Sequence, residues 1–393
     1  MNPAARVQAA IDLLDAVIAA VRGQGASADR VAADWFRARR FVGSKDRRAV
    51  RDLVWQAIRR CGECPPSGRA AMLCLAVDDP ALAALFDGSH YGPGPIAADE
   101  RAAPAGVAPA WLCDALAESG LDVAEQAALL GRAPLDIRAN RLRVTRDELA
   151  ASLPEPAEPG PASDSLRLPN GTAVESWPAF AQGLFEVQDA GSQLACAALD
   201  ARAGETVVDL CAGGGGKTLA LAAMMQGEGR LIACDVDRAR LSRLPERARR
   251  AGAEVECRLL DGGREIEALR DLAGKADAVL VDAPCSGTGT WRRNPEARWR
   301  LTPDAIARYA ALQAHVLDLA VRLVRPGGRI TFITCSLLDA EGAAGIDAFL
   351  VRHGGWCVRD IALPVGRPHA HGWRLTPGHD QTDGFFVANL SSP

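Results

Sequence analysis

Two cysteines stand directly after two expected β-strands, where a thiol can act as a nucleophile. Cys285 lies in the segment DAPCSGTG, which follows the apolar run 277–282, and Cys335 lies in TCS, which follows the run 328–334. Adjacent parallel strands end at the same edge of a sheet, so we expect the two thiols to be neighbours. Either is a candidate for covalent catalysis if positive charge or backbone donors lower its pKa from about 8.5.

A glycine-rich segment, DLCAGGGGKT at 209–218, follows another expected strand and leads into a helix. Its consecutive glycines let backbone N–H groups approach a ligand closely. A phosphate-binding P-loop ending at Lys217 and Thr218 needs glycine at position 211, which is Cys211, and a dinucleotide fingerprint needs glycine at 218 or 219. We therefore expect a nucleoside ligand that carries a compact charged group instead of a phosphate chain. S-adenosylmethionine is such a molecule.

Acidic residues end several of the expected strands. Asp235 is placed to accept hydrogen bonds from both ribose hydroxyls of the cofactor, and Asp261 to lie by its adenine. Carboxylates also suit the positive charge of a sulfonium. Asp282, three residues before Cys285, is placed to hold the amino and ring-nitrogen edge of a cytosine. The alternative for each acid taken alone is a helix N-cap.

The thiols and the expected cofactor together indicate one type of reaction. Carbon 5 of a pyrimidine is too electron-poor to attack a methyl sulfonium unaided, and thiolate addition at carbon 6 makes it nucleophilic. After methyl transfer, a base removes the carbon-5 proton and the thiolate is expelled. A base stacked inside a helix cannot expose carbon 6, so the target must lie in a loop or be flipped out.

The order of elements predicts an α/β fold in the second half of the chain. After residue 183, short apolar runs that end in an acidic residue alternate with helical stretches. This pattern is typical of a Rossmann-like, mostly parallel sheet with its ligand crevice at the carboxyl ends of the strands. We therefore expect residues 183–393 to form a class I methyltransferase domain.

The first half of the chain predicts three further segments. Residues 1–88 show helical periodicity and are expected to be all-α. Residues 89–108 are rich in Gly, Pro and Ala and are expected to form a linker. Residues 109–182 combine helical and strand-like stretches with several prolines, which predicts a small α+β unit.

The composition is that of a globular protein, with 48% hydrophobic and 24% charged residues among 393. No apolar run is long enough to span a membrane, and Asp12, Asp15 and Asp29 interrupt the region where a signal peptide would lie. Eleven cysteines without disulfide-framework spacing fit a reducing compartment. We therefore expect a cytoplasmic protein with no membrane partner.

Positive charge is concentrated in two places although the net charge is −4. Residues 1–60 contain twelve Lys and Arg against six Asp, which indicates either a phosphate-contacting module or a solvated helical surface. A second basic stretch follows Cys285 and is placed to grip phosphates or stack on bases, the alternative being a loop with structural tryptophans. Its members are Trp291, Arg292, Arg293, Arg298, Trp299 and Arg300.

Two remaining signals concern single side chains. Lys217 is one of only three lysines in the chain, which favours a functional role for it. Cys61 and Cys64 have C-x-x-C spacing, but no second pair at zinc spacing follows them, so we expect no metal site.

Taken in order, the motifs of this chain resemble those of the RsmB/NOP/Sun family of RNA cytosine-5 methyltransferases. The resemblance is specific over residues 183–390 and fainter over 109–182. This chain departs from the family at Gly213-Gly214, where the family usually has Ala-Pro. Two flexible residues thus replace a pair that contains the rigid proline. The segments that carry it are PAWL, LDIRANRLRV, VQDAGSQ, DLCAGGGGKT, ACDVDRARL, LLDGG, DAPCSGTGTWRRNP, ITCS and DGFFVANL.

The resemblance implies a role for each candidate residue. By position, the resemblance implies that Cys335 is the nucleophile and that Cys285 assists release of the product. It also indicates RNA as the substrate, because DNA cytosine methyltransferases take their nucleophile from a Pro-Cys motif, whereas Cys335 lies in a Thr-Cys-Ser element. The N-terminal helical region sits where the rRNA-directed members carry a NusB-like RNA-binding domain. The implied cofactor site is lined by Cys211, Ala212, Gly213, Gly214, Gly215, Gly216, Lys217, Asp235, Asp261 and Asp282.

The resulting expectation is an S-adenosylmethionine-dependent enzyme that forms 5-methylcytidine in RNA, with 16S ribosomal RNA as the first choice of substrate. We expect it to act as a monomer and to bind no DNA. The alternatives are a transfer RNA cytosine-5 methyltransferase and a ribosome-assembly protein that binds RNA without turnover.

Overall fold

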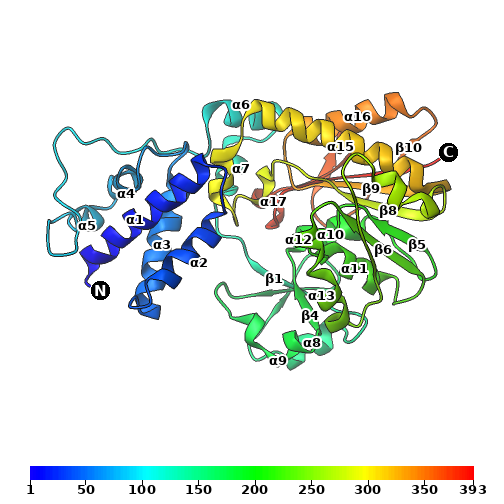
Figure 1. The fold of residues 1–393 in the computed structure, drawn as a ribbon, viewed down its shortest axis with the longest axis horizontal. Helices are drawn as coiled ribbons and strands as arrows, with labels where there is room; N and C mark the ends of the chain where they lie inside the picture. Colours follow the sequence, from blue (N-terminus) through cyan, green and yellow to red (C-terminus); the bar gives the residue numbers. More distant parts are fainter. The chain divides into compact units, whose positions relative to one another are not determined.

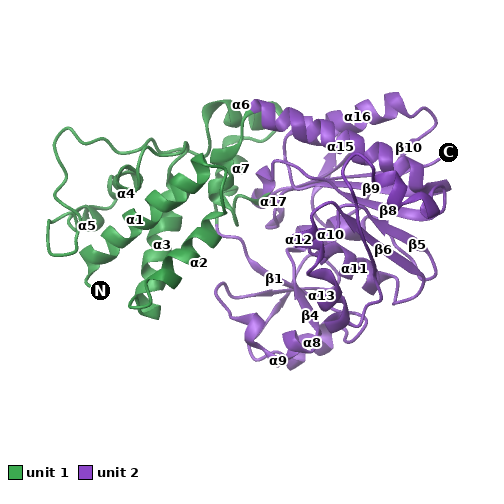
Figure 2. Ribbon diagram, viewed as in Figure 1, with its two compact units in different colours: residues 1–131, 290–302 green, residues 132–289, 303–393 purple.

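The structure is a computed structural model that describes all 393 residues. The chain forms two compact units (Figure 2). Unit 1 comprises Met1–Gly131 and Thr290–Thr302, and unit 2 comprises Arg132–Gly289 and Pro303–Pro393. The division at residues 131 and 132 falls inside segment 109–182, which was expected to form one α+β unit: its first two helices belong to unit 1 and its strands belong to unit 2. The inclusion of Thr290–Thr302 in unit 1 was not expected either. None of the helices combines the length and apolar character that a membrane-spanning segment requires.

Unit 1 is all-α. Its first helix begins where the side chain of Asn2 accepts a hydrogen bond from the Ala5 N–H at 2.7 Å and Pro3 takes the first helical position. Apolar residues at helical spacing then pack into one core. The helices are α1 (Pro3–Arg22), α2 (Ala28–Ala38), α3 (Ser44–Arg60), α4 (Gly68–Ala76), α5 (Pro80–Ala83), α6 (Ala110–Glu118) and α7 (Val123–Ala128).

Residues 89–108 contain no helix or named strand, but they are tied to the helices of unit 1 by backbone hydrogen bonds. The N–H of Ala103 donates to the carbonyl of Ala70 at 2.9 Å, and that of Gly106 donates to the carbonyl of Arg60 at 3.0 Å. This segment therefore packs onto unit 1 and does not form the boundary between the units.

The basic stretch after Cys285 is a structural part of unit 1, which agrees with the alternative of structural tryptophans and not with base stacking by Trp291 and Trp299. Trp291 and Arg298 are fully buried, and Trp299 belongs to the core of the unit. The Arg298 guanidinium donates to the carbonyls of Ile58 and Cys61 at 2.7 and 2.6 Å. Trp299 fills the core and Arg298 caps carbonyls because the short 3₁₀ helix η4 (Pro295–Arg300) contacts helices α1 and α3.

The large sheet of unit 2 has the order β11-β12-β13-β9-β8-β5-β6-β7, and β10 pairs with β13. Strands β5 to β9 are parallel, which confirms the expected Rossmann-like sheet. The chain runs outward from β5 to β7 and then returns to β8 on the other side of β5. The switch point between β5 and β8 is where α/β sheets bind ligands. The strands are β5 (Thr206–Asp209), β6 (Arg230–Asp235), β7 (Glu256–Leu259), β8 (Ala276–Asp282), β9 (Val324–Thr334), β10 (Cys357–Arg359), β11 (Arg367–His369), β12 (Gly372–Leu375) and β13 (Phe385–Ser391).

Helices cover both faces of this sheet (Figure 1). Side chains of α10 and α11 pack on one face, and those of α15 and α16 pack on the other. The elements are α10 (Ala190–Ala197), α11 (Gly216–Met224), α12 (Arg238–Leu241), α13 (Leu244–Ala251), α14 (Glu265–Ala268), η2 (Arg270–Leu272), η3 (Thr288–Thr290), α15 (Pro303–Leu323), η5 (Asp339–Glu341), α16 (Ala343–Arg352) and α17 (Pro377–Asp380).

A smaller antiparallel sheet with the order β2-β3-β1-β4 precedes the large one in unit 2. Thr145 opens its longest helix with a capping box, in which the Glu148 side chain accepts from the Thr145 N–H. The elements are β1 (Leu135–Ala139), α8 (Arg146–Ser152), β2 (Glu158–Pro159), β3 (Ser165–Leu168), η1 (Val174–Ser176), α9 (Pro178–Ala181) and β4 (Phe185–Val187).

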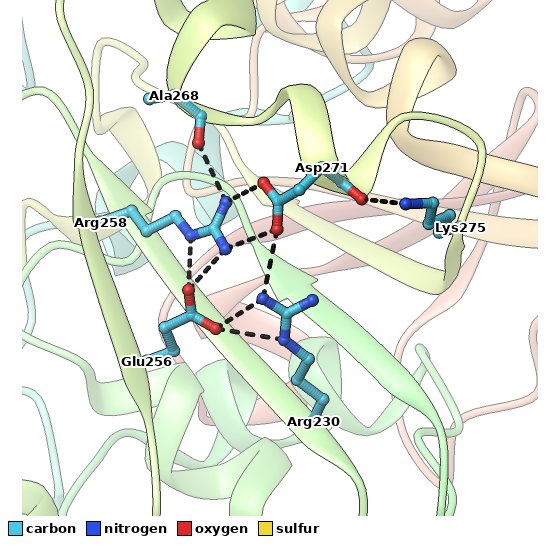
Figure 3. A network of polar contacts seen from close by, with 6 residues as sticks. All are labelled: Arg230, Glu256, Arg258, Ala268, Asp271 and Lys275. Carbon is cyan, nitrogen blue, oxygen red and sulfur yellow. Dashed lines mark hydrogen bonds and ion pairs between the residues drawn. The ribbon is translucent and has the colours of Figure 1, made fainter.

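The edge of the large sheet at β7 carries a network of ion pairs (Figure 3). Arg258 contacts Glu256 on its own strand and Asp271 in η2, and Arg230 at the start of β6 pairs with the same two carboxylates. Charged side chains on an edge strand discourage pairing with a further strand. The network therefore protects this end of the sheet.

Candidate active site

The thiols of Cys285 and Cys335 are in contact, with their Sγ atoms 3.4 Å apart. Strands β8 and β9 are neighbours in parallel register, with Asp282 opposite Ile333, so the loops that follow them leave the sheet side by side. Both residues are partly buried and neither is in a disulfide. The two cysteines that the sequence indicated therefore lie at one point of the sheet edge.

The environment of Cys285 keeps its thiol protonated. The hydrogen bond with Cys335, together with burial and the nearby charge of Glu341, raises the pKa of Cys285 well above its usual range. Cys285 is therefore a thiol at neutral pH and a possible proton donor.

Lys217 brings a positive charge to the thiol pair. Its Nζ donates to Oδ2 of Asp282 at 2.7 Å and lies 5.4 Å from the centre of the Phe385 ring. Burial opposes the charge of this lysine, but the charge and hydrogen bond of Asp282, with a smaller contribution from Cys335, raise its pKa overall. Lys217 thus stays charged beside Cys335, which is the kind of neighbour that a thiolate needs.

The glycine segment makes a sharp turn between β5 and α11. Gly213 and Gly215 have φ of +54° and +86°, in the left-handed region that favours glycine. A Cβ on Gly215 would clash with Cδ1 of the buried Leu244. Gly215 precedes α11 without a side-chain cap, so the first N–H groups of the helix face the edge of the sheet without a side-chain acceptor.

The acids around this turn differ in their surroundings. Asp235 accepts hydrogen bonds from the N–H groups of Gly213 and Asp237, each at 2.7 Å, so one function of this carboxylate is to hold the glycine turn. Asp261 is exposed and follows β7, the strand next to β6. Both therefore lie at the carboxyl edge of the sheet, as their positions after strands predicted.

Asp209 is a fully buried carboxylate at the end of β5. Its Oδ2 accepts from Oγ1 of Thr218 at 2.6 Å, and its Oδ1 has no hydrogen-bond partner. Burial raises the pKa of Asp209 to about 7. Burial likewise raises the pKa of Cys211, two residues further on, well above its usual range, so that thiol is not a nucleophile.

Two arginines, one in α12 and one in α13, lie against the glycine turn. Arg247 in α13 donates to the carbonyl of Gly214 and pairs with Glu186 at 2.7 Å. The ideal Cβ position of Gly213 lies 2.5 Å from the Arg240 guanidinium. The linear sequence carries no signal for these contacts, since they depend on how α12 and α13 fold back over the turn.

Glu341 is a further residue at the site that the sequence did not indicate. It is fully buried in η5, six residues after Cys335, and its carboxylate accepts hydrogen bonds from the residue after each cysteine. An acid in a loop after a strand is common, so its spacing from Cys335 gave no distinct signal.

Comparisons with known proteins show which sequences and structures this chain is similar to. Residues 196–391 match the family model described as 16S rRNA methyltransferase RsmB/F. Ribosomal RNA small subunit methyltransferase B of Salmonella arizonae is 37% identical over 268 residues, which cover 66% of this chain and 60% of that protein. The chain thus spans about three fifths of the length of this curated relative.

Two solved structures share the fold. The crystal structure of PH0851 is 25% identical, covers 96% of this chain and 98% of its own, and gives a TM-score of 0.74. A methyltransferase homolog from Pyrococcus horikoshii is 26% identical, with a TM-score of 0.60, over 72% of this chain and 99% of its own. Together with the match over residues 196–391, these similarities show that the chain belongs to the RsmB/F family of methyltransferases.

Proposed function

We propose that this chain is an S-adenosylmethionine-dependent RNA methyltransferase that forms 5-methylcytidine in 16S ribosomal RNA. The observation that carries the proposal is the pair of thiols in contact at 3.4 Å, beside a charged lysine and the uncapped glycine turn. The names of the family model and of the curated relatives support ribosomal RNA as the substrate.

The residues at the end of β5 suit a cationic cofactor with a nucleoside part. Asp209 offers a buried oxygen without a partner, and a cation nearby would favour its charged form. Asp235 keeps acceptor capacity for ribose hydroxyls beyond its two backbone donors, and the exposed Asp261 is available for adenine. When bound, S-adenosylmethionine supplies an electrophilic methyl group. The residues that would hold it are Cys211, Ala212, Gly213, Gly214, Gly215, Gly216, Lys217, Asp235, Asp261 and Asp282.

The electrostatics of the thiol pair favour Cys335 as the nucleophile. Cys285 retains its proton at neutral pH, whereas Cys335 lies close to the ammonium of Lys217. In the proposed reaction the Cys335 thiolate bonds to cytosine carbon 6, and the electron pair moved to carbon 5 would form the bond to the methyl group. The bond from that methyl group to the sulfonium sulfur would break, and its electron pair would stay on the departing thioether. A base then takes the carbon-5 proton, and the returning electrons break the bond between sulfur and carbon 6.

Cys285 and Asp282 act at the last and the first step of the proposed reaction, the release of the product and the binding of the base. The Cys285 thiol lies against Cys335 and is placed to assist release of the product from the nucleophile. Asp282 is oriented by Lys217 and its side chain remains about one third exposed, so an oxygen is available to the amino and ring-nitrogen edge of cytosine. The ion pair thus links the position of the base to that of the cofactor turn.

The test is methyl transfer from tritiated S-adenosylmethionine to ribosomal RNA from a strain that lacks the modification. We expect incorporation by the wild type and none by Cys335→Ala, because without the thiolate carbon 5 stays unreactive. We expect Cys285→Ala to accumulate a protein–RNA adduct that survives denaturation. Bisulfite sequencing of the product locates the modified cytidine.

The outcomes separate the alternatives. Incorporation into transfer RNA but not ribosomal RNA would select the transfer RNA enzyme. RNA binding without incorporation at any cofactor concentration would select the non-catalytic assembly protein. An adduct that accumulates with Cys335→Ala and not with Cys285→Ala would reverse the two cysteine roles.

A further inference from the structure

A single buried carboxylate joins the two loops that carry the thiols. Glu341 accepts at Oε1 from the N–H of Ser286 at 2.7 Å, and at Oε2 from the hydroxyls of both Ser286 and Ser336, the latter at 2.7 Å. Ser286 follows Cys285 and Ser336 follows Cys335. The residue after each cysteine is therefore hydrogen-bonded to the same carboxylate.

The surrounding contacts tie the same loops together. Gln313 in α15 donates to the carbonyl of Pro284 at 2.9 Å and to Oε1 of Glu341 at 3.3 Å. Thr288 accepts from the N–H of Leu337 at 2.8 Å, and its hydroxyl is 3.2 Å from that of Ser336. The loop after β8 and the loop after β9 thus form one hydrogen-bonded unit around Glu341.

The carboxylate is held by hydrogen bonds alone. Its two oxygens receive four donors, which uses the acceptor capacity of a carboxylate, and Glu341 forms no ion pair with a lysine or arginine. Burying a charge without a counter-ion is costly, so such a group is a poor choice for stability alone. Its value lies in the geometry that it imposes on the groups around it.

We propose that Glu341 is a positioning residue that fixes the distance between the Cys285 and Cys335 thiols. The proposal rests on the proposed function for its catalytic meaning, but its geometric content can be tested separately. Without the carboxylate, the Ser286 and Ser336 ties to it are lost together. The two serines then keep only their own 3.2 Å contact with each other, and the remaining links between the loops lie further along, at Thr288 and Gly289. The thiols then sample larger separations.

A glutamine at this position distinguishes geometry from charge. The amide oxygen can accept from Ser286 N–H and Gln313, as Oε1 does now, and the amide N–H groups can donate to the two serine hydroxyls. All four ties are therefore available to Glu341→Gln, whereas Glu341→Ala loses them. A positioning role predicts that Gln rescues what Ala removes.

The rate of disulfide formation between Cys285 and Cys335 reports on the distance between their thiols. Diamide oxidises two thiols to a disulfide while its N=N bond takes up the two electrons and two protons, and the rate for a given pair depends on how often the sulfurs meet. We expect rapid formation of the Cys285–Cys335 disulfide in the wild type, followed by mass spectrometry of the cross-linked peptide. We expect Glu341→Ala to form it at least about tenfold more slowly and Glu341→Gln within about threefold of the wild type.

Methyl transfer provides the second measurement. We expect Glu341→Ala to lower kcat by about 100-fold with an unchanged KM for S-adenosylmethionine, since a misplacement of about 1 Å has this effect on a reacting group. Glu341→Gln should restore most of kcat. The matched control is Glu265→Ala, which removes a buried glutamate of the same unit whose partner is His315 and which touches neither loop.

Each result decides the proposal. Equal disulfide rates for Glu341→Ala and the wild type would overturn it, and so would Glu341→Gln behaving like Glu341→Ala. If Glu341→Ala does not fold, Ser336→Ala removes one tie with less disturbance and should give an intermediate disulfide rate; an unchanged rate would count against the proposal. If even the wild type methylates no RNA, the proposed function fails while the disulfide rates still report on Glu341.

Discussion

The buried carboxyl group of Asp209 makes the free energy of unfolding depend on pH. Its pKa of about 7 lies above the ordinary value of 3.8, so the folded protein binds a proton more tightly than the unfolded chain does. Stability from this group is therefore present at low pH and is lost as pH rises from about 4 to about 7. The full difference corresponds to about 4 kcal/mol, taken as an upper limit.

We expect Asp209→Asn to remove this dependence in the cofactor-free protein. Near pH 4 the variant and the wild type should have similar free energies of unfolding, and toward pH 8 the variant should become the more stable one. Urea denaturation at pH 4, 5, 6, 7 and 8 measures the difference. A difference that stays constant with pH would show that Asp209 titrates alike in the folded and unfolded chains.

A substitution at Gly215 tests the backbone conformation of the glycine turn between β5 and α11. Gly215→Ala forces a Cβ into the left-handed region, which costs about 1–2 kcal/mol, and brings it against the buried Leu244. We expect a loss of at least that size in the free energy of unfolding from urea denaturation. Gly216→Ala is the matched control, because Gly216 has an ordinary φ and no atom within 4 Å of its ideal Cβ. Equal effects of the two changes would contradict the strained turn.

The sequence could indicate residues whose place after a strand is diagnostic. Cys285, Cys335, Asp235 and Asp282 were all found this way, because the end of a parallel strand determines where the next side chains lie. The partners of those residues could not be found. Glu341 reaches the cysteines only through a loop that folds back, and Arg247 reaches the glycine turn only through the packing of α13.

At the scale of elements, the ion pairs on β7 make a pH-dependent contribution. The hydrogen bond from Arg258 lowers the pKa of Asp271 below its ordinary value of 3.8. Its contribution to stability is present above that value and is lost as pH falls through the folded-state pKa. Asp271 is half exposed, so solvent screening limits its pairs to less than about 1 kcal/mol each.

We expect Asp271→Asn to lower Tm slightly at pH 7, with the deficit shrinking in 1 M NaCl and toward pH 3. Glu228→Gln, which removes an exposed carboxylate without a partner, should leave Tm unchanged at each condition. Calorimetric scans at two pH values and two salt concentrations compare the three proteins. A deficit that persists in high salt would mean that the network acts through packing and not through charge.

The elements themselves were predictable to different degrees. The alternation of apolar runs and helices predicted the parallel strands β5 to β9, and four of these runs, β5, β6, β8 and β9, have the burial of central strands, whereas β7 lies at the edge of the sheet. The short antiparallel strands β10 to β12 were not separated from loops, since two to four residues carry no period. The place of Trp291 and Arg298 in unit 1 could not be predicted from their sequence neighbours, because the preceding residues, with Cys285, belong to unit 2.

At the scale of the whole molecule, the proposed function requires the protein to hold an RNA far larger than one cytosine, and unit 1 offers an exposed aromatic and basic surface. Phe41, between α2 and α3, is 82% exposed, and the exposed residues Arg40, Lys45 and Arg48 lie close to it in the sequence. Several other arginines of the region are already paired, among them Arg30 and Arg37 with Asp34. We therefore expect RNA to contact this turn by base stacking on Phe41 and by phosphate contacts.

Phe41→Ala should weaken RNA binding by about 1–3 kcal/mol, the usual contribution of one stacked base, and leave S-adenosylmethionine binding unchanged. Lys45→Gln with Arg48→Gln should reduce the slope of log K against log salt by about 0.7 for each phosphate that is no longer neutralised. Val77→Ala removes another exposed apolar side chain of unit 1 and should have no effect on either quantity. Filter binding at several salt concentrations, with the target stem-loop of 16S RNA, measures both. Base stacking does not depend on salt, whereas phosphate contacts do. A Phe41→Ala protein with a changed salt slope would therefore contradict stacking at Phe41. A Lys45→Gln/Arg48→Gln protein with an unchanged salt slope would likewise assign RNA recognition to a different surface.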